Sequence, residues 1–123
     1  MATKSERMHE ILEKLGSIGG VKASSVISSD GIPMSDIMLS GVDSNTFAAM
    51  VASMLGSAET ALKSLGAKAF DKVIAESSEV RVIAIKAGDN AILSVMVDPN
   101  TNYGLILLEA KKSADAIAKI VNE

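Results

Sequence analysis

Few residues in this chain could act as a nucleophile, a general base or a metal ligand. His9 is the only histidine, and there is no cysteine. A Ser-His-Asp triad would have to recruit His9 from a helix near the N-terminus, and the chain has no Gly-x-Ser-x-Gly turn to present the serine. A metal site would need carboxylates to complete the ligands around the same histidine. We therefore expect His9 to lie on a solvated flank, with no catalytic and no metal-binding residues in the chain.

Glycines and acidic residues do not form a cofactor or calcium site either. The motif Gly16-x-x-Gly19-Gly20 follows a predicted helix and has no Gly-Lys-Ser/Thr after it. A phosphate cradle needs a glycine loop that opens a helix, so we expect a flexible connector and no bound cofactor. Three acidic residues lack the spacing of a calcium loop: Asp30, Asp36 and Asp43.

The remaining charged residues suggest no reaction. Glu76 and Glu79 bracket a predicted turn, where charge is ordinary. The only two arginines are Arg7 and Arg81, and no motif places either one as a transition-state finger. We therefore expect a protein that is not an enzyme.

Composition narrows the class of protein further. The net charge of −3 and a pI of about 5.1 argue against nucleic-acid binding, which favours basic proteins. No apolar run is long enough to cross a bilayer, and the N-terminus lacks the apolar core of a signal peptide. We expect a cytoplasmic protein without direct membrane insertion, folded as a single domain over residues 1–123. Its core must be aliphatic, because aromatic residues make up only 2%.

The apolar spacing predicts the order helix, two strands, helix, three strands, helix. Thr3 and Glu6 can form a capping box for the first helix, and Ser29-Asp30-Gly31 predicts a tight turn between the first two strands. Pro33 favours an edge position for the second strand. The predicted strands cover residues 21–28, 32–38, 68–77, 79–86 and 91–97, and the helices cover residues 3–16, 44–65 and 102–121. Short links between the last three strands predict an antiparallel meander, and their two-sided apolar pattern predicts a sheet covered on both faces.

The long helix over residues 44–65 is the most unusual element, because Glu59 and Lys63 are its only charges. These two lie four residues apart and predict a narrow solvent-facing wedge. We expect four of its large apolar residues to pack on the chain's own sheet: Phe47, Met50, Met54 and Leu62. A stripe of small residues lies beside them: Ala49, Ser53, Gly56 and Thr60. A helix over its own sheet normally presents a polar half to water, so we predict that this stripe is a homodimer contact.

Two leucines of the last helix do not fit its apolar side. Leu105 and Leu108 fall away from the face that Ile106, Ala110 and Ile117 share. Either they contact a partner, or residues 103–108 are partly extended; the sequence leaves both open.

Two motifs resemble the roadblock/dynein light chain family. The first is the hairpin over Ser29-Asp30-Gly31-Ile32-Pro33, which is similar to "S-x-D-G-x-P" and precedes an Ala- and Met-rich helix. The second is the strand over residues 92–105, which ends in a pattern similar to "D-P-x-x-N-x-G-L". The resemblance spans residues 5–121.

The resemblance implies an α/β sandwich of five antiparallel strands, with the long helix on one face and the two terminal helices on the other. Members of that family typically dimerise through the long helix and the third strand, which gives a continuous ten-stranded sheet. They serve as platforms or regulators for small Ras-like GTPases, or as light chains in motor and trafficking assemblies. The resemblance supplies no catalytic residue.

Two functions follow as hypotheses. One is a non-enzymatic, homodimeric regulator of a small Ras-like GTPase. The other is a light-chain-like scaffold subunit with no GTPase partner. A third, a small-molecule sensor, is disfavoured by the scarcity of aromatic and convergent polar residues.

Overall fold

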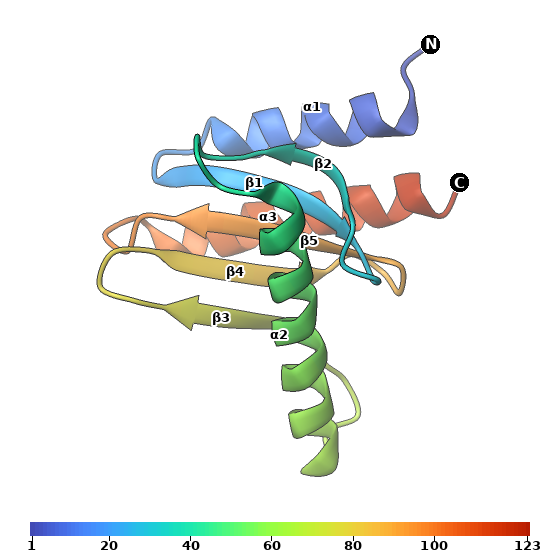
Figure 1. The fold of residues 1–123 in the computed structure, drawn as a ribbon, viewed down its shortest axis with the longest axis vertical. Helices are drawn as coiled ribbons and strands as arrows, with labels where there is room; N and C mark the ends of the chain where they lie inside the picture. The colour runs from blue at the N-terminus through green and yellow to red at the C-terminus, as the bar shows by residue number, and fades with distance from the viewer.

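The computed structural model describes residues 1–123 as one five-stranded antiparallel sheet with helices on both faces (Figure 1). The elements in chain order are α1 (Lys4–Gly16), β1 (Val21–Ser28), β2 (Pro33–Ile37), α2 (Ser44–Ser64), β3 (Lys72–Glu76), β4 (Arg81–Lys86), β5 (Ala91–Val97) and α3 (Tyr103–Val121). The predicted order of elements is confirmed.

The strands lie in the order β2-β1-β5-β4-β3. The antiparallel meander of β3, β4 and β5 is therefore confirmed, and β1 completes the sheet by pairing with β5, with Ser25 opposite Ser94. β2 is an edge strand, as Pro33 predicted, because proline has no N–H to donate to a second neighbour. The other edge is β3.

Helices cover the two faces of the sheet unequally. α1 and α3 lie on one face and bury the larger core, in which Leu12, Ile106 and Ile117 are inaccessible to solvent. α2 lies alone on the other face, across the strands, where Val51 packs with Ile27 and their neighbours in a smaller core. This arrangement is the predicted fold class.

Short polar side chains start each helix. Thr3 and Glu6 form the predicted capping box of α1. The carboxylate of Asp43 accepts hydrogen bonds from the amides of Asn45 and Thr46, and the Asn102 side chain accepts one from the Leu105 amide. Each cap satisfies amides that have no partner inside the helix. None of the three helices is both long and apolar enough to span a membrane.

The bounds of several elements differ from the prediction, most of all those of β3. β3 begins at Lys72, four residues after the predicted start at residue 68, so residues 65–71 form the connection from α2. α3 begins at Tyr103, so residues 103–108 are helical and the extended alternative is excluded. Just after β5, Asp98 accepts a hydrogen bond from the Asn100 amide, and Asn102 then caps α3.

Candidate functional site

The side of α2 that faces the sheet continues beyond the sheet's edge. Ala48, Val51 and Leu55 are buried against the strands, and their spacing continues through Ala58 and Leu62 to Leu65. Figure 1 shows the C-terminal part of α2 projecting past β3, the edge strand. Leu62 is consequently 42% exposed and Leu65 84% exposed. We call residues 60–65 the overhang.

The predicted packing of α2 is therefore wrong at two positions. Phe47 and Met54 pack partly against the smaller core, as expected. Met50 is 60% exposed, because the buried side is centred on Ala48, Val51 and Leu55 and position 50 points away from it. Leu62 has the correct phase but lies beyond the last strand, where the chain has no sheet to cover it.

The small-residue stripe lies on the solvent side of α2. Ser53, Gly56 and Thr60 are exposed and border an open, shallow hollow on the helix, while Ala49 is half-buried. The Ser53 hydroxyl donates to the Ala49 carbonyl at 2.9 Å. The stripe is a continuous surface, and its role as a dimer contact stays a prediction.

Glu59 differs from its predicted solvent-facing position. Its carboxylate accepts a hydrogen bond from the Lys86 ammonium at 3.0 Å and lies 3.4 Å from Lys63, and its side chain is only 22% exposed. The Lys86 hydrogen bond, with both positive charges, lowers the pKa of Glu59. The pair ties α2 to β4 at the start of the overhang.

Both arginines are engaged by neighbouring side chains. Arg7 donates two hydrogen bonds to the Glu123 carboxylate, at 2.6 and 2.7 Å, which lower the pKa of Glu123. Arg81 Nε lies 3.0 Å from a Glu76 oxygen, and its guanidinium carbon lies 5.1 Å from the centre of the Tyr103 ring. Burial, followed by the negative charge of Glu76, raises the pKa of Tyr103.

The remaining sequence candidates are dispersed. His9 is exposed on α1, with its Nδ1 3.5 Å from the Ser35 hydroxyl, and the structure holds no group of three or more His, Cys, Asp or Glu side chains placed to share a metal ion. Leu105 and Leu108 are both exposed on the first turns of α3.

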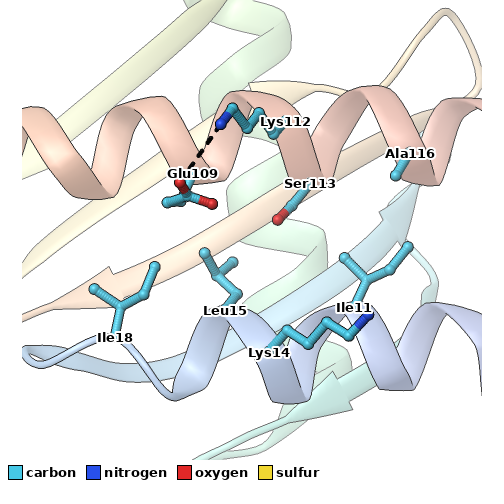
Figure 2. Close-up of a pocket in the computed structure, with 8 residues that line it drawn as sticks. All are labelled: Ile11, Lys14, Leu15, Ile18, Glu109, Lys112, Ser113 and Ala116. Carbon is cyan, nitrogen blue, oxygen red and sulfur yellow. Dashed lines mark ion pairs between the residues drawn. The ribbon is translucent and has the colours of Figure 1, made fainter.

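One surface was missed by sequence reasoning. α1 and α3 lie side by side and enclose a groove of about 250 Å³ (Figure 2). Four apolar residues line the groove: Ile11, Leu15, Ile18 and Ala116. Three charged residues and one serine complete the lining: Lys14, Glu109, Lys112 and Ser113. The two helices come from opposite ends of the chain, so no local pattern could indicate the groove.

Comparison with known proteins places this geometry in a family. The family model for the Roadblock/LC7 domain matches residues 8–97. Two uncharacterized proteins of Methanocaldococcus jannaschii, MJ0714 and MJ0310, are 30% and 29% identical over 107 residues. The matches cover 87% of this chain, and 90% and 93% of those proteins.

Solved structures share the fold at lower sequence identity. An MglB structure with a tetrameric arrangement has a TM-score of 0.88 at 23% identity, covering 99% of this chain and 93% of that one. The gliding protein MglB of Thermus thermophilus has a TM-score of 0.86 at 21% identity, with the same coverage. A Roadblock/LC7 domain of Streptomyces avermitilis has a TM-score of 0.86 at 14% identity, covering 94% of this chain and 98% of that one.

Proposed function

The chain belongs to the Roadblock/LC7 family, and from this membership we propose that it is a cytoplasmic, non-enzymatic homodimer that binds a small Ras-like GTPase and modulates its nucleotide cycle. The observation that best supports the proposed homodimer is the overhang of α2. Leu62 and Leu65 continue the buried side of the helix but have no sheet beneath them. A second copy paired along β3 would supply that sheet.

The sequence of β3 suits pairing with itself. β3 reads Lys-Val-Ile-Ala-Glu and has a neighbour on one side only. In an antiparallel, two-fold pairing centred on Ile74, Lys72 lies opposite Glu76 of the second copy, twice per dimer. The two five-stranded sheets then form one ten-stranded sheet, and each overhang lies over the sheet of the other copy.

α2 also supplies the proposed contact between the two helices. The small-residue stripe of Ala49, Ser53, Gly56 and Thr60 lets two α2 helices approach closely. A specific dimer of this kind should bury about 1,200–2,000 Å². The tetrameric arrangement of one MglB structure concerns that protein, and for this chain it supports self-association in general.

The dimer is tested by exchanging the two charges of β3. Lys72→Glu or Glu76→Lys alone places like charges opposite each other, and we expect each to weaken the dimer about tenfold. The double variant Lys72→Glu/Glu76→Lys restores opposite charges between the two copies and should bind itself more tightly than Glu76→Lys, because these two variants lack the Glu76–Arg81 ion pair equally. Sedimentation across a concentration series measures this, and a wild-type chain that stays monomeric at micromolar concentration contradicts the proposal.

The GTPase role is proposed as an indirect one. The dimer surface would hold the switch loops of the GTPase in their catalytic arrangement, which shifts the population towards a competent state. Leu105 and Leu108 are the candidate partner contacts, because both are exposed and apolar. The alternative is a light-chain-like scaffold subunit whose partner is not a GTPase.

A nucleotide-dependence test separates the two functions. The chain is used to capture partners from native lysate, and any Ras-like GTPase recovered is then purified and loaded with GDP or a non-hydrolysable GTP analogue. Binding that depends on the nucleotide supports the regulator. Failure to bind a GTPase in either state supports the scaffold.

A further inference from the structure

The groove between α1 and α3 has an apolar floor that suits the side chains of a helix. Ile11, Leu15 and Ile18 approach it from α1 and its following turn, and Ala116 closes it from α3 (Figure 2). Its volume of about 250 Å³ is below the 300–1,000 Å³ that is usual for small-molecule pockets. The groove therefore fits a few inserted aliphatic side chains better than a cofactor.

Charge on α1 is segregated about this groove. Lys4, Arg7 and Lys14 follow the flank that faces α3, in line with Ile11. Three acidic residues lie on the other flank, around His9 and next to β2: Glu6, Glu10 and Glu13. In a chain with a net charge of −3, the groove is thus the basic side of α1.

Two lysines of the groove lack a strong partner. Lys4 and Arg7 are already engaged by Glu123. Lys14 forms no ion pair, and Lys112 has only a 3.8 Å contact with Glu109. These two cations stand on opposite rims, one on each helix, above the apolar floor (Figure 2).

α3 extends the apolar line towards its N-terminus. Leu105 precedes Glu109, Lys112 and Ala116 at helical spacing, so it lies on the flank of α3 that borders the groove. Leu105 is exposed. It adds an apolar contact for a ligand longer than the groove itself.

From these observations we propose that the α1/α3 groove binds an amphipathic helix of a partner protein, with acidic residues beside its apolar stripe. The apolar side chains fill the floor, and the acidic ones pair with Lys14 and Lys112. A membrane surface fits less well, because the site is concave and the acidic flank of α1 would repel anionic lipid. The groove lies on the opposite face of the sheet from α2, so the proposal does not depend on the dimer. Leu105 is the one residue that it shares with the proposed GTPase contact.

The test uses a displayed library of amphipathic helical peptides, in which apolar positions vary among Leu, Ile, Met and Phe and flanking positions among Asp, Glu, Gln and Lys. Peptides are selected on the full chain and counter-selected on Lys14→Glu/Lys112→Glu. Both lysines are exposed, so this variant should fold. The matched control is Lys22→Glu/Lys111→Glu, which changes the net charge equally at exposed lysines that do not line the groove.

We expect the selected peptides to carry Asp or Glu beside the apolar stripe. By fluorescence anisotropy at about 0.15 M salt, each should bind the groove variant about tenfold more weakly and the control variant equally well. Analogues with Lys in place of the acidic residues should regain affinity for the groove variant. Because the chain has no cysteine, Ser113→Cys gives a single thiol in the groove for disulfide tethering of the peptide, with Asp115→Cys as the control outside it.

Three results overturn the proposal. The first is a selection that yields no peptide sensitive to Lys14→Glu/Lys112→Glu. The second is equal binding of the acidic peptides and their lysine analogues to the wild-type chain. The third is binding of phosphatidylglycerol vesicles through these lysines without binding of any peptide, which would make the groove a membrane contact.

Discussion

The two arginines have the guanidinium group that a transition-state finger needs, but their side chains are not free to move. Such a finger needs a guanidinium on an exposed, positionable loop. Arg7 is held by two hydrogen bonds to Glu123, and Arg81 lies in β4 between Glu76 and the Tyr103 ring. Moving either one onto a bound nucleotide would break these contacts first. The residues therefore favour an indirect effect on GTP hydrolysis.

Replacing the arginines tests this directly. If the proposed GTPase partner exists, we expect Arg7→Ala, Arg81→Ala and the double variant to change its rate of GTP hydrolysis by less than about tenfold, because both side chains are engaged within this chain. Loss of a true arginine finger costs about 10³ or more. A loss of that size from either change, with the dimer intact, would falsify the indirect mechanism.

Gly20 is the glycine whose replacement we expect to be most damaging to the fold. Its φ is +96°, and a Cβ built there would lie 1.7 Å from Thr101 Cγ2. Gly20→Ala should lower the free energy of unfolding by about 2–4 kcal/mol, through the clash and the backbone strain together. Urea unfolding measures this.

The neighbouring Gly19 supplies the control for this change. A Cβ at Gly19 meets nothing within 4 Å, so Gly19→Ala should be close to neutral. Adding Thr101→Ala to Gly20→Ala removes the clashing methyl group and should restore part of the lost stability. If Gly20→Ala is as stable as the wild-type chain, the predicted clash with Thr101 is wrong.

At the scale of elements, Glu59 and Lys86 make the attachment of α2 to the sheet sensitive to acid. Because the Lys86 hydrogen bond lowers the pKa of Glu59, the folded chain binds that proton less tightly than the unfolded chain. This stabilisation is complete above about pH 4.5 and is lost as the pH falls through the lowered pKa. Glu59→Gln should therefore lower stability more at pH 7 than at pH 3.

Thermal unfolding at the two pH values checks this prediction. Glu13→Gln serves as the control, because Glu13 is an exposed glutamate on α1 without an ion pair. If Glu59→Gln lowers the melting temperature equally at both pH values, the effect comes from packing and the titration has no part in it.

The elements that sequence predicted well are those with local signals. The Thr3 cap and the Gly31 turn each depend on residues within a few positions, and both are confirmed. The orientation of α2 was partly wrong, because apolar residues surround most of that helix and several faces satisfy the same periodicity. Spacing also cannot show where a sheet ends, so the exposure of Leu62 and Leu65 required the structure.

The candidate surfaces were predicted less completely than the elements. The small-residue stripe was visible because it lies on one helix. The groove was not, because Lys14 and Lys112 are brought together only by the packing of α1 on α3.

At the scale of the whole molecule, α2 offers two proposed dimer contacts that substitutions can separate. Gly56→Arg places a charge in the small-residue stripe, and if the stripe is buried between two helices the dimer should weaken by about 3–5 kcal/mol. Leu62→Arg places a charge in the overhang, and we expect it to weaken the dimer by a similar amount. Light scattering over a dilution series measures both, with His9→Arg on the opposite face as the control. A wild-type dimer constant in Gly56→Arg shows that the stripe is simply exposed.

The position of β1 beside β5 has a consequence for how the chain folds. Ser25 pairs with Ser94, 69 residues further along the chain, whereas β3, β4 and β5 are consecutive and joined by short turns. Closing a long loop costs more entropy than closing a hairpin, so the meander should form early and the β1–β2 hairpin should dock late. During synthesis, the first hairpin has no neighbour in the sheet until residue 97 has left the ribosome. We expect pulse-labelled hydrogen exchange to protect β4 before β1.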